Sequence, residues 1–180
     1  MADWSGIFLR EYLGAAAGVA ASGYAAFSIA MALTRFGGDA LCERIGARGL
    51  VRLSGLLAAA GMTMVLLSPS TIGVIAGFAC TGAGFATVVP LAFSAAGRTP
   101  GMSAGVALSM VTTLGYLGFL IGPPLIGFAA ALIGLRLALV AIFLTSTLIA
   151  VLAPAAGGRR AARPRSRPQP AEPSLVGSAG

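Results

Sequence analysis

The chain has 180 residues, of which 57% are hydrophobic and only 9% are charged, and its mean hydropathy is +0.93. A soluble domain of this size would lack the polar side chains needed to cover its surface. Apolar runs approach the ~20 residues that cross a bilayer as a helix. We therefore expect an all-α integral membrane protein. Its net charge of +7 comes from 12 arginines, whose distribution favours membrane topology over nucleic-acid binding.

The chemistry that the composition permits is narrow. There is no histidine, and the two cysteines are too few for a disulfide framework or a zinc site. No ionisable residue lies well inside an apolar run, which leaves no obvious proton-coupling group and argues against a membrane-embedded hydrolase. We expect no enzyme, no catalytic residue, no metal and no cofactor.

The N-terminal segment predicts a short helix at the membrane interface. Residues 4–13 are too few to span a bilayer, and Trp4 and Tyr12 are residue types that favour the interface. Asp3 stands where a signal peptide would carry positive charge, and no cleavable pattern precedes the first apolar run.

Five apolar segments are then predicted to span the membrane, at about 14–34, 50–67, 71–96, 103–128 and 134–153. Proline removes a helix hydrogen bond, and broken membrane helices line cavities or act as hinges. We expect Pro90 to kink the third span and Gly122, Pro123 and Pro124 to interrupt the fourth. Residues 1–153 thus form one transmembrane bundle, and the Arg/Pro-rich residues 154–180 are predicted to be a disordered tail.

A charged loop is predicted between the first two spans, from Arg35 to Arg52. Its four arginines, Arg98 and five arginines of the tail fall on one side of the membrane, and only Arg10 and Arg136 fall on the other. By the positive-inside rule, the loops and tail are cytoplasmic and the N-terminus is outside. The tail could bind nucleic acid or anionic lipid headgroups, but a topology anchor is favoured. The Ala, Gly, Pro and Arg bias suggests a bacterial genome, hence the bacterial inner membrane.

Polar side chains within the spans are candidates for a solute path. They form two clusters: Tyr24 with Ser28 in the first span, and Ser109, Thr112, Thr113 and Tyr116 in the fourth. Residues three and four apart share a helix face, so each cluster points in one direction. The alternative is that the hydroxyls bond to their own helix and the tyrosines pack within the bundle.

The charged loop resembles a signature of the major facilitator superfamily. The match consists of Arg35-Phe36-Gly37-Gly38-Asp39, Leu41 and Glu43-Arg44-x-Gly46-x-Arg48 between two spans. The run Gly115-Tyr116-x-Gly118-x-x-x-Gly122-Pro123-Pro124 is similar to helix eleven of that family. The chain resembles its C-terminal half, from the end of helix seven to helix twelve, in a bacterial branch similar to sugar permeases. Thr34 and Ala40 depart from the Gly and Arg that members often carry.

The resemblance implies a conformational-switch loop made of Arg35, Gly38, Asp39, Glu43, Arg44, Gly46 and Arg48. Asp39 would face the N-terminus of a helix in the other half, where the helix dipole stabilises a carboxylate. Arg44 and Arg48 would tie the loop together by charge-assisted bonds.

The implied function is secondary transport of a small solute by alternating access, in a truncated or half-length form. The implied partners are a small-molecule solute, the lipid bilayer and a complementary N-terminal half or a second copy, with no nucleic acid. One alternative is a non-transporting five-span membrane protein, either a decayed remnant or an assembly partner. Another is a lipid-interacting anchor whose basic tail recruits a cytoplasmic partner.

Overall fold

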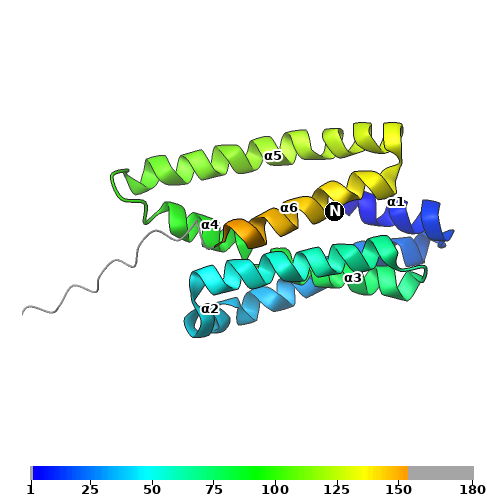
Figure 1. The fold of residues 1–180 in the computed structure, drawn as a ribbon, viewed down its shortest axis with the longest axis horizontal. Coiled ribbons are helices and arrows are strands. Elements are labelled where there is room, and N and C mark those ends of the chain that lie inside the picture. The colour runs from blue at the N-terminus through cyan, green and yellow to red at the C-terminus, as the bar shows by residue number, and fades with distance from the viewer. Residues whose placement is uncertain (1, 154–180) are drawn as a thin grey trace, which may run out of the picture.

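The computed structural model describes residues 2–153, which form helices and no strand (Figure 1). The helices are α1 (Ala2–Leu13), α2 (Ala17–Leu67), α3 (Thr71–Phe85), α4 (Val88–Ala96), α5 (Ala104–Ile133) and α6 (Leu135–Leu152). By length and composition, four helical stretches can cross a membrane: Ala17–Leu67, Thr71–Ala96, Ala104–Ile133 and Leu135–Leu152. The all-α membrane architecture is confirmed, whereas the predicted tail lies outside the described residues.

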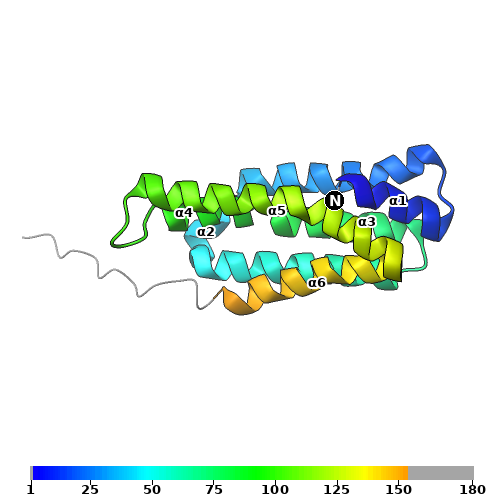
Figure 2. The ribbon, with the colours of Figure 1, turned by 90° about the horizontal axis from the view of Figure 1, so that it is seen from above.

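Helix α2 differs most from the predicted elements. Its 51 residues would extend about 77 Å as a straight helix, more than twice the ~30 Å bilayer core. The chain instead reverses at Gly46, the non-helical residue within α2, with φ 75° and ψ 159°. Figures 1 and 2 show the two arms running back from this reversal. Ala17–Leu67 therefore supplies two antiparallel passes.

The expected loop between Arg35 and Arg52 was wrong, because these residues are helical on both sides of Gly46. Glycine alone readily adopts a positive φ with an extended ψ, so a single residue suffices for the reversal. The charged residues extend the arms beyond their apolar parts. The first arm also begins at Ala17 rather than at residue 14, because Gly14 has a φ of 61° in the turn after α1.

Helix α3 packs against both arms of α2 and forms the densest part of the bundle. A Cβ added to Gly61 of the second arm would lie 2.6 Å from the carbonyl oxygen of Gly77, and a Cβ on Gly82 would collide with the carbonyl of Phe27 in the first arm. Glycine at such positions lets helix backbones approach closely in lipid, where van der Waals packing holds helices together. The core beside them contains Phe8, Leu9, Phe27, Met62, Val65, Val74, Phe78, Leu135 and Leu139.

The predicted third span is split into α3 and α4, with the break at Ala86 and Thr87. Pro90 lies in the first turn of α4 and has no N–H to donate to the carbonyl of Ala86, and its ring would crowd that carbonyl. The first turn of a helix tolerates proline because its N–H groups have no intrahelical partner. Ending α3 before Pro90 and restarting as α4 therefore satisfies the local geometry.

The interruption expected in the fourth span is absent, because α5 continues through Pro123 and Pro124 to Ile133. The proline φ near −65° matches a helix, and membrane helices accommodate the lost hydrogen bonds. Helix α5 lies on the outside of the bundle and packs mainly on α6, and less on α4 (Figure 1). A Cβ on Gly115 or Gly118 would meet no atom within 4 Å. These glycines have no packing role within residues 2–153.

The end of the bundle opposite the α2 reversal is tied by Arg136, near the start of α6. Its Nε donates to the carbonyl oxygen of Leu66 in the last turn of α2, at 2.9 Å, and its Nη2 donates to the same oxygen. Its backbone N–H donates to the hydroxyl oxygen of Tyr12 in α1, at 3.1 Å. These bonds satisfy an orphan carbonyl and an orphan N–H, which helix ends always leave. Three helices are therefore joined at this end.

Candidate functional site

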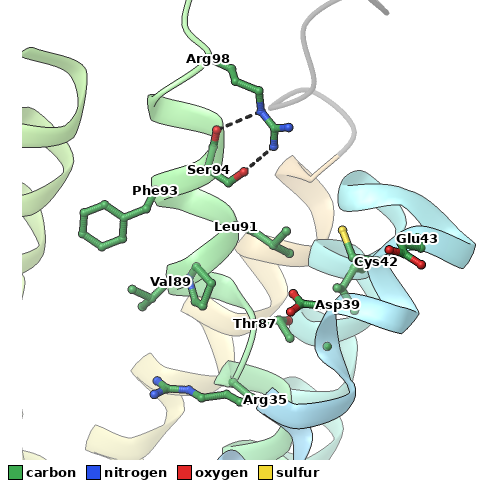
Figure 3. Close-up of a pocket in the computed structure, with 14 residues that line it drawn as sticks. Arg35, Asp39, Cys42, Glu43, Thr87, Val89, Leu91, Phe93, Ser94 and Arg98 are labelled. Atoms are coloured by element: carbon green, nitrogen blue, oxygen red, sulfur yellow. Dashed lines mark hydrogen bonds between the residues drawn. The ribbon is translucent and has the colours of Figure 1, made fainter. Parts of the chain in front are cut away.

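The first arm of α2 and helix α4 line most of an open-sided cavity of about 900 Å³ at the reversal end of the bundle (Figure 3). Both helices contribute charged and polar side chains to its wall. The lining residues are Arg35, Gly38, Asp39, Cys42, Glu43, Leu50, Ala86, Thr87, Val89, Pro90, Leu91, Phe93, Ser94 and Arg98. The cavity is therefore bounded by the predicted switch residues on one side and the helix break on the other.

The charged groups of the α2 wall lie four residues apart, at Arg35, Asp39 and Glu43, and so share a helix face. Long helical side chains lean towards the helix N-terminus, and Arg35 accordingly reaches back to the sulfur of Met31, at 3.7 Å. Within the described residues, no hydrogen bond or ion pair holds the carboxylates of Asp39 and Glu43. Both carboxylates are exposed and available to a further partner.

The α4 wall ends at Arg98, which turns back onto its own helix (Figure 3). Its Nε donates to the carbonyl oxygen of Ser94 at 3.1 Å, and its Nη2 donates to the Ser94 hydroxyl. A cation at this position satisfies carbonyls at the helix C-terminus and complements the helix dipole. Arg98 thus stabilises the end of α4 without attaching it to α2.

Thr87 joins the floor of the cavity to both arms of α2. Its hydroxyl forms a buried 2.7 Å hydrogen bond with the hydroxyl of Ser54 in the second arm. Its methyl group lies 3.0 Å from the position that a Cβ on Gly38 would occupy in the first arm. Gly38 is buried there, so glycine at this switch position allows the close approach of α2 to the helix break.

Comparison with models of known protein families identifies the family of this chain. The family model described as Major Facilitator Superfamily matches residues 4–178. The chain belongs to this superfamily.

Three relatives agree with this assignment. The membrane protein MosC of Rhizobium meliloti is 41% identical over 150 residues, covering 83% of this chain and 37% of its own. An uncharacterised MFS-type transporter of Yersinia pestis is 39% identical over 138 residues, covering 77% and 36%. An uncharacterised transporter of Sinorhizobium fredii is 38% identical over 152 residues, covering 84% and 40%. The chain therefore spans about two-fifths of the length of these relatives. No solved structure matches it significantly.

Four of the seven predicted switch residues of this superfamily member line the cavity, namely Arg35, Gly38, Asp39 and Glu43. The other three cluster at the reversal. Gly46 makes the turn itself, and Arg44 and Arg48 lie on either side of it with exposed side chains. The structure thus divides the signature into a cavity face and a turn, and the switch role of both parts stays a prediction.

The predicted solute-path residues lie outside this cavity. Tyr24 and Ser28 are on α2, and Ser109, Thr112, Thr113 and Tyr116 are on α5, which packs on α4 and α6 rather than extensively on α2. The structure therefore does not bring the two clusters together. The hydroxyl of Ser109 bonds to the carbonyl of Val106 in its own helix, at 2.9 Å, as the alternative expected. Tyr116 is 72% exposed and Tyr24 is 46% exposed, so neither is packed within the described bundle.

The predicted hinge residues have different surroundings. Pro90 lines the cavity beside the helix break, whereas Gly122, Pro123 and Pro124 lie within continuous helix and outside the cavity. The hinge role of Pro90 stays a prediction. The chain there lacks a continuous ladder of helical hydrogen bonds, because Pro90 has no N–H and the N–H of Ala86 bonds to the carbonyl of Ala83.

Sequence reasoning missed Ser54 and Ser94 and used Arg98 only as a topology marker, whereas Thr87 is one of the polar residues within the third predicted span. Thr87 had a local signal, because a threonine three residues before a proline fits the start of a helix. No sequence signal predicted the Ser54–Thr87 hydrogen bond, because the two residues are 33 positions apart and only the packing of α2 on the helix break brings them together.

Proposed function

We propose that this chain provides part of a secondary transporter that moves a small solute across the bacterial inner membrane by alternating access. Membership of the superfamily carries the proposal, because curated relatives are themselves named transporters. The substrate is proposed to be a small solute, and no enzymatic reaction is proposed.

The cavity supports this proposal at the level of residues. It places two carboxylates that have no partner within residues 2–153, an arginine and a close glycine contact beside a break in a membrane helix. A charged face beside a broken helix can make and release contacts without unfolding a buried core, because its charges already meet solvent. This is the arrangement needed for a part that changes shape during transport.

The working unit is proposed to contain further transmembrane helices of the same family, from a complementary half or a second copy. The matched segments make up 36–40% of the length of these curated relatives. Helix α5 is exposed around most of its surface, and its exposed large apolar side chains include Leu114, Tyr116, Phe119 and Leu120. The hydroxyls of Thr113 and Tyr116 on that helix would cost free energy against lipid tails and are better placed against protein or a solute path.

The membrane orientation is proposed to have the N-terminus outside and the reversal of α2 in the cytoplasm. Arg35 and Arg98 line one cavity at the reversal end, whereas Arg136 is bonded to Tyr12 and Leu66 at the other end. The excess of arginines at the reversal end supports this orientation through the positive-inside rule.

Solute flux in proteoliposomes tests the proposal. The proteins are the chain alone and a chimera in which the chain replaces the segment it matches in the Yersinia pestis relative. Radiolabelled hexose, amino acid and organic anion are offered with and without a pH gradient. Two matched variants accompany each protein: Gly38→Val, which pushes a side chain into Thr87, and Gly37→Val, whose Cβ would meet nothing within 4 Å.

The proposal expects flux of at least one solute above empty liposomes in the chimera, lost in Gly38→Val and kept in Gly37→Val. Flux by the chain alone would extend the function to this segment by itself. A folded chimera that carries no solute, while the relative does, would favour the alternative of a non-transporting assembly partner.

A further inference from the structure

We propose that a pocket at the end of the bundle opposite the α2 reversal binds an alkylammonium cation, supplied by a phospholipid headgroup or by a soluble amine. The pocket has a volume of about 490 Å³ and lies between α1 and the turn from α5 to α6. Figures 1 and 2 place both elements at this end of the bundle. Small-molecule sites have volumes of about 300–1,000 Å³, so the pocket has the size of a ligand site, and it shares no lining residue with the larger cavity.

The wall of this pocket carries negative charge. Its charged side chain is Glu11, which is exposed near the end of α1. Within the part of the chain that the structure describes, the Glu11 carboxylate has no ion pair or hydrogen bond. Neither Arg10 nor Arg136 lines the pocket, and the guanidinium of Arg136 is bonded to the carbonyl oxygen of Leu66. The carboxylate is therefore not neutralised by a cation of the pocket wall.

Two helix ends add to the negative potential of the pocket. Helix α1 ends at Leu13 and helix α5 at Ile133, and the last turn of each contributes a lining residue, Tyr12 and Ala131 respectively. The last carbonyl groups of a helix have no intrahelical donor, and the helix dipole places partial negative charge on them. Both helix ends thus stabilise a cation in the pocket and repel an anion.

Two aromatic rings in the wall, those of Trp4 and Tyr12, suit the alkyl groups of such a cation. The indole of Trp4 is held close to α5, because a Cβ added to Gly127 would lie 3.2 Å from its Cη2 atom. The ring of Tyr12 stacks on Phe8 with 4.8 Å between the ring centroids, and its hydroxyl accepts the N–H of Arg136 at 3.1 Å. A cation is attracted to the faces of such rings, and rings that are already held lose little freedom when it binds.

These groups favour an alkylammonium ion over a metal ion. A metal ion such as Ca²⁺ needs several oxygen ligands, and the described residues contain no group of three side chains that could hold one. An alkylammonium ion instead needs one opposite charge and an apolar surface, which Glu11, Ile7 and the two rings provide. Phosphatidylethanolamine and soluble quaternary amines share this chemistry. The proposal does not depend on the transport function.

The fluorescence of Trp4 reports on this pocket directly, because Trp4 is the single tryptophan of the chain. The full chain is prepared in dodecyl maltoside micelles, which contain no amine and no charge. It is titrated with trimethylammonium-TEMPO, a cationic nitroxide that quenches tryptophan, and separately with neutral hydroxy-TEMPO. The neutral nitroxide measures collisional quenching, so the extra quenching by the cationic one measures binding of the cation.

We expect saturable extra quenching by the cationic nitroxide. Its half-saturating concentration should rise about five-fold in Glu11→Gln, which removes the charge, and about three-fold in Tyr12→Leu, which removes a ring. Tyr12→Phe keeps the ring and should stay within about two-fold of the native value. Glu43→Gln is the matched control, because it removes an exposed carboxylate from the cavity at the other end of the bundle, and it should leave the titration unchanged.

Competition then identifies the source of the cation. Displacement of the nitroxide by phosphatidylethanolamine, but not by dioleoylglycerol, which has no amine, assigns the site to a lipid headgroup. Displacement by tetramethylammonium alone assigns it to a soluble amine, and displacement by both supports one site for either. Equal quenching by the two nitroxides overturns the proposal, as does extra quenching that neither amine displaces, that Glu11→Gln leaves unchanged or that Glu43→Gln lowers equally.

Discussion

Replacing Gly61 by alanine tests whether close backbone contact between α2 and α3 holds the bundle together. The added Cβ would lie 2.6 Å from both the carbonyl oxygen of Gly77 and the backbone nitrogen of Thr81. Carbon–oxygen contacts between helices normally lie at about 3.3 Å or more, so the helices must move apart by roughly 0.7 Å. Both opposing atoms are backbone and cannot rotate away.

The expected cost follows from two opposing effects. Overpacking against backbone costs about 3 kcal/mol, at the upper end of the usual range, and the better helix propensity of alanine returns about 1 kcal/mol. We expect Gly61→Ala to lower the free energy of unfolding by about 2 kcal/mol. The measurement is loss of helix by circular dichroism during SDS titration in mixed micelles.

Gly118→Ala is the matched control, because the new methyl group would meet no atom within 4 Å on the uncovered helix α5. It should be neutral or stabilise the chain by up to about 1 kcal/mol. Equal unfolding midpoints for the two variants would refute the account of the α2–α3 interface.

Three further predictions concern the reversal, the opposite end and the membrane orientation. Gly46→Ala should destabilise the chain by about 1–3 kcal/mol in the same titration, because alanine is strained at this backbone geometry. Gly37→Ala is the control, at a helical position with open space. A destabilisation by Gly46→Ala no larger than that by Gly37→Ala would contradict this prediction. Tyr12→Phe leaves the N–H of Arg136 without its hydroxyl partner, and amide hydrogen exchange at the start of α6 should quicken about five-fold; unchanged exchange would show that this bond contributes nothing. Cys42 should react with impermeant maleimide in inside-out vesicles and stay unmodified in right-side-out ones, and the opposite pattern would invert the proposed topology.

The helical membrane architecture was predictable because it rests on composition and on the length of apolar runs. The structure of the charged segment between Arg35 and Arg52 was harder to predict. Its polarity indicated a connection between two apolar passes, and the chain does reverse there, but polarity does not distinguish a loop from a charged extension of a helix. One glycine, Gly46, reverses the chain, and several glycines in this segment gave no local sign of which one would do so.

The prolines also show that local sequence does not decide where a helix ends. Pro90 lies in the first turn after a helix break, whereas Pro123 and Pro124 lie in continuous helix. Proline removes hydrogen bonds in both places, and the packing of neighbouring helices decides whether the chain also ends its helix. The cavity itself depends on pairs such as Ser54 and Thr87, which only the folded arrangement brings together.

The central claim is that this chain contains a moving part of a transporter rather than a static bundle. The most direct measurement is the distance distribution between spin labels on Cys42 and on a cysteine replacing Ala92, an exposed residue of α4, with Cys80 changed to serine. In nanodiscs we expect two resolved populations, for two positions of α4 relative to the first arm of α2, and a shift towards the longer distance in Thr87→Val, which removes the Ser54–Thr87 hydrogen bond. A single narrow distribution that Thr87→Val leaves unchanged would contradict the account.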